Sequence, residues 1–268
     1  MNNMKKVTYI VPIHEFDNNV KTYMKNAFVS FSKLKGAETA EIFLTGEVDV
    51  ITQAQNLFTQ VCGEDNTQII TLLPTDEKDL FAKINIAVSK CKTPYFSILE
   101  FDDEFYDYWD IVAQRYTDKD YSIILPITEI VTPKGEIAGL ANEIVWDAAF
   151  VKQKELGFIA HEDLFIFKDF LTSGSYIKTK DFIEFGGLKP ELKIAAWYEY
   201  LLHTVTAGKQ IFVAPRIGYR HTMAREGSYT VLAAKELSQE EGVALIKKAM
   251  EKYPIPENVE FQGDIREQ

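Results

Sequence analysis

The segment Thr93–Asp103 (TPYFSILEFDD) constrains the fold of this chain more than any other. Its short apolar run lies between a proline and an acidic cluster, which is typical of a buried strand in an α/β sheet. Glu100, Asp102 and Asp103 come at the carboxyl end of that strand, where open α/β sheets bind their ligands. Carboxylates this close together repel one another unless a cation holds them, and such hard oxygen ligands suit Mg²⁺ or Mn²⁺. The alternative is an acidic turn that leads into the next element.

Strand-like and helix-like segments alternate through the first half of the chain. The β-branched and apolar runs predict strands at Val7–Ile13, Ala40–Leu44 and Gln68–Leu73. Apolar residues at helical spacing predict helices at Asn18–Leu34, Thr52–Cys62 and Asp79–Cys91. This alternation predicts an α/β fold with a mostly parallel sheet flanked by helices.

The second half of the chain is less regular. We expect strands at Tyr121–Pro126 and Gln210–Ala214, a turn at Val131–Gly135 and a helix at Ala195–Thr206. Glu143–Phe150 and Asp163–Phe170 give mixed signals. Ser238 and Glu241 form a capping-box pattern, which predicts a C-terminal helix that ends near Tyr253.

Composition and charge limit the class of protein. The 268 residues, 46% of them hydrophobic, are enough for a large core, and the net charge of −11 argues against a nucleic-acid partner. The two cysteines, Cys62 and Cys91, have no metal-ligand spacing and fit a reducing compartment. The apolar run near the N-terminus ends at Pro12, too early for a signal peptide or a membrane span. We therefore expect a soluble cytoplasmic protein.

Three blocks of sequence together resemble the family 2 glycosyltransferases, which have the GT-A fold. They are VTYIVPIHEF, NIAVSKCKTPYFSILEFDD and FGGLKPEL followed by AGKQIFVAPRIGYRH, and they extend from about Val7 to His221. The resemblance implies a domain over residues 1–230, with a nucleotide-binding half to about 120 and an acceptor-side half after it. Residues 231–268 would add a helix and a tail. It also implies inverting transfer of a sugar from a nucleotide-sugar, such as a UDP-sugar, with Mn²⁺ or Mg²⁺ as cofactor.

The resemblance also assigns the residues of the donor site. By position, the loop after the first strand would contact the nucleotide through Pro12, His14 and Glu15, and the helix before the acidic strand through Asn85. The family's Asp-x-Asp-type signature, which grips ribose and the metal-bound diphosphate, matches Glu100, Asp102 and Asp103. Asp103 would be the metal ligand, with Asp102 beside it or on the ribose. His221 would be a further metal ligand. A purely structural role for this histidine is an equally weighted alternative.

The C-terminal part carries a second, pattern-level resemblance. YRHTMAREGS, with FGGLKPELKI and WYEYLLH, is similar to compact glycosyltransferase-like proteins often encoded by large tailed bacteriophages. Arg216, Arg220 and Arg225 cluster in this region, which we expect to be a loop. They would neutralise a diphosphate, or else balance an acidic surface.

The chain departs from the family pattern at two positions. The family's general base is the Asp of a Glu-Asp pair early in the helix after the Gly-Gly turn, and that pair falls on Ala196-Trp197. Glu199 lies two residues on, about 200° around the helix, so we favour a solvated pair with His203 over a role as base. Glu191, on the preceding loop, is the other candidate. In place of the family's Asp-Asp after the second strand, this chain has Thr45-Gly46-Glu47. Glu47 either recognises the nucleotide base or is an exposed turn residue.

Three functions follow from these patterns. The first is a metal-dependent glycosyltransferase that acts on an unknown glycan or protein acceptor. The second is a GT-A-fold protein with impaired catalysis that serves as a structural or binding component with protein assembly partners, for instance in a virion. The third is a carbohydrate-binding sensor that keeps the donor pocket. The carboxylates favour the enzyme. The missing general base keeps the second function, a protein with impaired catalysis, as a strong alternative.

Overall fold

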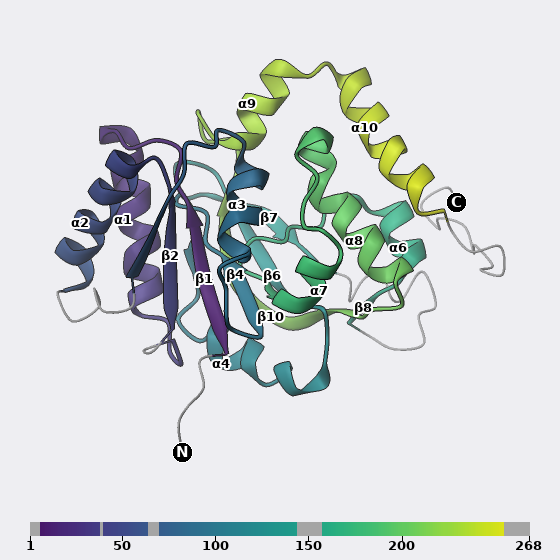
Figure 1. Cartoon of the computed structure of the whole chain (residues 1–268), viewed down its shortest axis with the longest axis horizontal. Coiled ribbons are helices and arrows are strands. Elements are labelled where there is room, and N and C mark those ends of the chain that lie inside the picture. The colour runs from purple at the N-terminus through teal and green to yellow at the C-terminus, as the bar shows by residue number, and fades with distance from the viewer. Residues whose placement is uncertain (1–5, 38–39, 64–69, 144–156, 255–268) are drawn as a thin grey trace.

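A single mixed sheet runs through the chain, with helices on both faces (Figure 1). The computed structural model describes residues 6–37, 40–63, 70–143 and 157–254. The strand order is β3-β2-β1-β4-β9-β6-β10-β5, with β7 paired to β6 and β8 paired to β10. Since β3, β2, β1, β4, β6 and β10 all run in the same direction, the sheet is mostly parallel, as the sequence predicts.

The elements of the described residues have the following bounds. The strands are β1 (Val7–Pro12), β2 (Glu41–Gly46), β3 (Ile70–Pro74), β4 (Tyr95–Ile98), β5 (Glu104–Phe105), β6 (Ile123–Val131), β7 (Ile137–Ala141), β8 (Phe158–Ile159), β9 (Tyr176–Lys178) and β10 (Ile211–Thr222). The α-helices are α1 (Asn18–Ser32), α2 (Val48–Cys62), α3 (Leu80–Val88), α4 (Trp109–Gln114), α6 (His161–Ile166), α7 (Thr179–Glu184), α8 (Ala196–Thr206), α9 (Tyr229–Glu236) and α10 (Gln239–Lys252). Two short 3₁₀ helices are η2 (Thr117–Lys119) and η3 (Pro190–Ala195).

The elements expected in the first half are confirmed, with shifts at their ends. Asp17 and Asp79 accept hydrogen bonds from the first turns of α1 and α3, which explains where these helices begin. β4 is shorter than the apolar run suggested, because the chain leaves the sheet after Ile98. In the second half, the capping box of Ser238 and Glu241 is confirmed at the start of α10.

Several second-half elements differ from expectation. β10 continues to Thr222, well beyond the expected end at Ala214, so Arg216 and Arg220 lie in a strand and not in a loop. The expected turn after Val131 is confirmed, and it joins β6 to β7. Most of the expected Glu143–Phe150 segment and the tail after Pro254 lie outside the described residues.

The two faces of the sheet carry two separate cores, because side chains alternate along each strand. Tyr9 packs with α1, α2 and α4, whereas its neighbour Ile10 packs with α3, α7 and α8. The C-terminal helices add to the second core: α9 contacts α3 through the rings of Tyr229 and Phe81, 4.9 Å apart, and α10 packs on η3 and α8. Among the described residues, no helix combines the length and the apolar character needed to cross a membrane.

A buried carboxylate ties α4 to the sheet. Asp110 accepts hydrogen bonds from the hydroxyls of Tyr9 (2.7 Å) and Tyr176 and from the Gln114 side-chain amide (2.5 Å). Burial raises the pKa of both tyrosines well above the ordinary range, so both stay protonated and keep donating. The network holds α4 against β1 and β9.

We predict that Asp110→Ala destabilises the fold by about 3 kcal/mol, because two buried hydroxyls lose their shared acceptor. Urea denaturation would measure this change. The matched control is Asp118→Ala, whose side chain is 86% exposed and whose loss should change stability by less than about 0.5 kcal/mol. Equal effects of the two substitutions would contradict the role assigned to the network.

Candidate functional site

The acidic residues after β4 lie against the end of β10. The Leu99 N–H donates to the Ile10 carbonyl (2.9 Å), and the Asp103 N–H donates to the Glu100 carbonyl (3.1 Å), which closes a turn. The chain then enters β5, which pairs antiparallel with β10. This pairing brings His221 beside Asp103, although 118 residues separate them in the sequence.

Asp103 is fully buried and accepts two hydrogen bonds from the end of β10. The donors are the Thr222 N–H (2.8 Å) and the Nδ1–H of His221 (3.0 Å). Burial lowers the pKa of His221, but Asp103, with Asp102 and Glu100 behind it, more than offsets this and raises the pKa to about 9. Burial raises the pKa of Asp103, and the hydrogen bonds from β10 work against that shift. The two side chains form an ion pair at neutral pH.

Asp102 is bound by an arginine from the segment that follows β10. The Nε of Arg225 donates to Asp102 Oδ2 (2.6 Å), and its Nη1 donates to Glu15 Oε1 (3.1 Å). The guanidinium is almost completely buried and lies 5.0 Å from the centre of the Phe101 ring. Arg225 therefore joins the end of β4, the loop after β1 and the segment after β10.

His14 completes this contact between the loop after β1 and the segment after β10. Its Nε2–H donates to the Gly227 carbonyl (3.3 Å), and its ring lies 5.0 Å from the ring of Phe101. Burial lowers the pKa of His14. The structure thus places His14 and Glu15 beside the acidic cluster.

Glu100 shares the same enclosure as the two aspartates. Burial raises its pKa to about 8, and the charges of Asp102 and Asp103 contribute to the shift. Glu100 is therefore mostly protonated at neutral pH, whereas the neighbouring carboxylates are neutralised by His221 and Arg225. These two cationic side chains, which come from the C-terminal half of the chain, offset the repulsion between the carboxylates of the cluster.

We expected a divalent cation on Asp103, Asp102 and His221, and in the structure these side chains are engaged by protein partners. The Thr222 N–H and His221 occupy the two oxygens of Asp103, and Arg225 occupies Asp102. The described residues do not arrange three His, Cys, Asp or Glu side chains around one point. Mg²⁺ generally takes only one or two carboxylates from a protein, and water and phosphate oxygens complete its shell. A cation at this position would have to replace the hydrogen bond from His221 to Asp103 and take the rest of its ligands from water or phosphate oxygens.

Two further candidates lie at strand ends outside this cluster. Pro12 is the last residue of β1 and lies opposite Thr45 of β2. Glu47 is exposed at the start of α2 and pairs with Lys78, whose hydrogen bond lowers the pKa of Glu47. Both are at the carboxyl edge of the sheet, and neither contacts the aspartates in any interaction of the described residues.

Asn85 is engaged by the Gly-Gly turn. Its amide nitrogen donates to the Leu188 carbonyl (2.9 Å), and its amide oxygen accepts from the Leu188 N–H (2.9 Å). Gly187 has a φ of +66°, and a Cβ there would lie 2.4 Å from Asn85 Oδ1, so the turn requires glycine. In this structure Asn85 orders the turn that precedes η3 and α8.

The structure corrects the environment expected for Glu199. We expected a solvated side chain, but Glu199 is 1% exposed and accepts hydrogen bonds from Lys252 Nζ (2.6 Å) and the Tyr253 hydroxyl (3.0 Å). The Tyr253 ring also stacks on His203 at 5.0 Å, and its carbonyl accepts from His161 (3.1 Å). The end of α10 therefore covers this carboxylate, a contact between segments that no local pattern predicts.

Glu191 lies in η3, whereas Arg216 and Arg220 lie in β10. Glu191 is exposed in η3, next to the kink at Lys193, where φ is 45°. Arg220 pairs with Glu129 of β6 (Nε to Oε2, 2.6 Å), and Arg216 is exposed. Of the three arginines, Arg225 is the one that reaches the acidic cluster, and its burial excludes the expected alternative of a surface charge.

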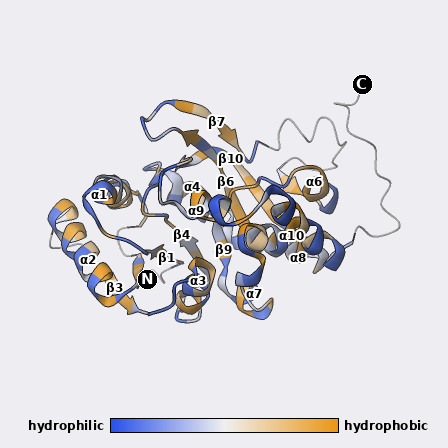
Figure 2. Ribbon diagram, turned by 90° about the horizontal axis from the view of Figure 1, so that it is seen from above, coloured by the Kyte–Doolittle hydropathy of each residue, from blue (hydrophilic) through white to orange (hydrophobic). Residues whose placement is uncertain are grey.

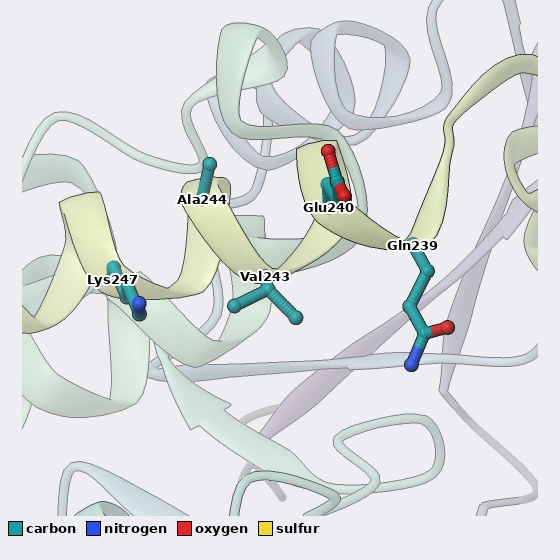
Figure 3. Close-up of a pocket in the computed structure, with 5 residues that line it drawn as sticks. All are labelled: Gln239, Glu240, Val243, Ala244 and Lys247. Carbon is teal, nitrogen blue, oxygen red and sulfur yellow. The ribbon is translucent and has the colours of Figure 1, made fainter.

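A pocket of about 340 Å³ lies along α10 (Figure 3). The close-up shows Gln239 and Val243 on the same side of α10. Its lining residues are Gln239, Glu240, Val243, Ala244 and Lys247. None of them belongs to the candidate site.

The chain matches no protein-family model and no curated protein. It does match solved structures. The structure of S. aureus TarS 1-349 in complex with UDP-GlcNAc has a TM-score of 0.66 and 14% sequence identity, over 94% of this chain and 68% of that chain. The complex of the same protein with UDP gives 0.62 and 14%, over 91% and 70%. These likenesses confirm the GT-A-like fold that the family resemblance implies.

We predict that His203 makes the stability of the wild type depend on acid pH. Burial lowers the pKa of His203 from its ordinary value. The charge of Lys252 lowers this pKa further, and the charge of Glu199 raises it. A lowered pKa in the folded state means that stability is complete above the unfolded value of about 6.5 and is lost as the pH falls below it. His203→Phe keeps a ring against Tyr253 and should reduce this loss between about pH 7 and pH 5.

Thermal or urea denaturation at several pH values would measure the difference between the wild type and His203→Phe. Every other titrating group is common to both proteins, so their contributions cancel. A parallel loss of stability in both proteins would contradict the prediction.

Proposed function

We propose that this chain is a glycosyltransferase that transfers a sugar from a UDP-sugar to an acceptor hydroxyl, with inversion and with Mn²⁺ or Mg²⁺. One observation carries the proposal: carboxylates, His221 and Arg225 gather at the carboxyl edge of a GT-A-like sheet. Similar structures were solved with UDP-GlcNAc and with UDP. Ligands of open α/β sheets bind at this edge.

Each residue of the cluster has a part in this function. Asp103 and His221 would hold the divalent cation in place of the proton that His221 now donates to Asp103, and the cation would stabilise the charge on the departing diphosphate as a Lewis acid. Glu100 and Asp102 would contact the ribose, and Arg225 fixes the orientation of Asp102. Pro12, His14, Glu15 and Glu47 line the same edge and would contact the nucleotide.

Glu191 is the better candidate for the base that accepts the proton of the attacking hydroxyl. It is exposed in η3, directly after the Gly-Gly turn that Asn85 orders. Glu199 is buried under Lys252 and Tyr253 and cannot reach an acceptor without movement of α10.

The alternative is a GT-A-like protein that binds a nucleotide-sugar, or protein partners in an assembly such as a virion, without catalysis. Ala196 and Trp197 occupy the first turn of α8, where the family places its Glu-Asp pair, and neither accepts a proton. The two functions share the donor site and differ in turnover.

We predict that the wild type binds UDP, and that Mn²⁺ tightens the binding. In Asp102→Asn/Asp103→Asn the affinity should fall by about tenfold or more, because the cation loses its carboxylate ligand. Isothermal titration calorimetry with UDP and UDP-GlcNAc, with and without Mn²⁺, would measure this. Asp118→Asn is the control, since its side chain is exposed and pairs with Lys6 on the surface. An absence of binding at millimolar ligand would contradict the donor site.

We predict that Glu191→Gln lowers the rate at which UDP-GlcNAc is hydrolysed to UDP and GlcNAc, with water in place of the acceptor hydroxyl, by about 10²-fold or more. UDP affinity should stay unchanged, as expected when a general base is lost. A coupled assay for UDP would measure the rate. Glu199→Gln is the matched control: it should lower the stability, with little effect on the rate of the folded protein. UDP binding with no release in the wild type would favour the non-catalytic alternative.

A further inference from the structure

Asn85 on α3 holds the start of the segment that carries Glu191. Its amide nitrogen donates to the Leu188 carbonyl and its amide oxygen accepts from the Leu188 N–H, both at 2.9 Å. α3 lies beside α7, which leads into the Gly-Gly turn, on the face of the sheet that also carries α8 (Figure 2). Because both hydrogen bonds go to one residue, they fix the position and the orientation of the Leu188 backbone.

Asn85 and the Gly-Gly turn fit together closely. Gly187 comes directly before Leu188 and has a φ of +66°, and a Cβ on it would lie 2.4 Å from Asn85 Oδ1. Leu188 itself is 1% exposed and packs in the second core. The Leu188 backbone therefore cannot shift without breaking both hydrogen bonds to Asn85.

Glu191 comes three residues after Leu188, in a tight turn. Pro190 restricts the backbone of this turn, and the Leu192 N–H donates to the Lys189 carbonyl (2.9 Å). Leu188 and Leu192 are both buried, whereas Glu191 between them is exposed. The carboxylate thus projects to solvent from a short segment that is anchored on both sides.

We propose that Asn85 is a positioning residue for Glu191, in place of the nucleotide contact that the family resemblance implies. This inference rests on the proposed function, in which Glu191 accepts the proton of the attacking hydroxyl. As that oxygen bonds to the anomeric carbon, the bond from the sugar to the diphosphate breaks and UDP leaves, so the carboxylate must lie within hydrogen-bond reach of the hydroxyl. Both polar atoms of the Asn85 side chain are engaged by Leu188.

The kinetics of UDP-GlcNAc hydrolysis by Asn85→Asp test this inference. The aspartate keeps the shape of the side chain and can accept from the Leu188 N–H, but it no longer donates to the Leu188 carbonyl. We expect kcat to fall by about tenfold or more, with KM and the calorimetric Kd of UDP within about twofold of the wild type. A residue that contacts the nucleotide would show the reverse, a raised Kd of UDP with an unchanged kcat, and that result would overturn the inference.

Asn142→Asp is the matched control, because Asn142 holds Leu171 by the same two kinds of hydrogen bond (2.9 and 3.0 Å) outside the Glu191 segment. It removes the same donor and adds the same charge, so it should lower the thermal midpoint and leave kcat unchanged. Gly187→Ala is a second test variant, since its Cβ displaces the Asn85 side chain, and it should lower kcat as Asn85→Asp does. An equal loss of kcat in Asn142→Asp would reduce the role of Asn85 to stability alone and overturn the inference.

A double variant tests whether Asn85 acts through Glu191. Asn85→Asp/Glu191→Gln should be as slow as Glu191→Gln alone, because the position of a side chain that no longer accepts a proton has no effect on the rate. A further loss of about tenfold in the double variant would overturn the inference, and so would a wild-type kcat in Asn85→Asp. Failure of the proposed function looks different: Glu191→Gln would keep the wild-type rate, or the wild type would not hydrolyse UDP-GlcNAc, and the inference would fall with it.

Discussion

The arrangement of this chain depends on how it neutralises the carboxylates at the end of β4. Three acidic side chains lie within four positions; burial raises the pKa of Glu100 to about 8, and the charges of Asp102 and Asp103 add to this shift. The neutralising groups, His221 and Arg225, come from the far end of the sequence. Folding of the N-terminal half is therefore coupled to the placement of β10 and the segment after it.

β10 can supply these groups because it pairs in two directions. It runs parallel to β6 from Ile211 to Thr222, and near its end it pairs antiparallel with β5, the two residues that follow the acidic turn. The register of this second pairing decides that His221 and Thr222 face Asp103. A shift by one residue would turn His221 to the opposite face of the sheet. The strand register, more than any single ligand, determines the geometry of the site.

The sequence predicts the first half of this fold and the acidic cluster, since both depend on local signals: apolar periodicity, caps, and carboxylates at a strand end. It predicts His221 only through a family resemblance. The roles of Arg225, Asn85 and Glu199 were out of reach, because each depends on a partner more than 50 residues away. We expected Arg225 to neutralise a diphosphate or to balance an acidic surface. In the structure its guanidinium instead donates hydrogen bonds to Asp102 and Glu15. Burial and pairing of charged residues are tertiary properties, and local spacing does not encode them.

The same reasoning separates the two halves of the site. At the end of β4, Asp102 and Asp103 are each held by a cationic partner, Arg225 and His221. On the acceptor side, the first turn of α8 presents Ala196 and Trp197, and the next carboxylate, Glu199, is occupied by the end of α10. Proton transfer from an acceptor would therefore fall to a residue of the loop before α8, where Glu191 is exposed beside a strained backbone at Lys193. Since Asn85 orders that loop through Leu188, the donor-side helix α3 also fixes where the acceptor-side base would stand.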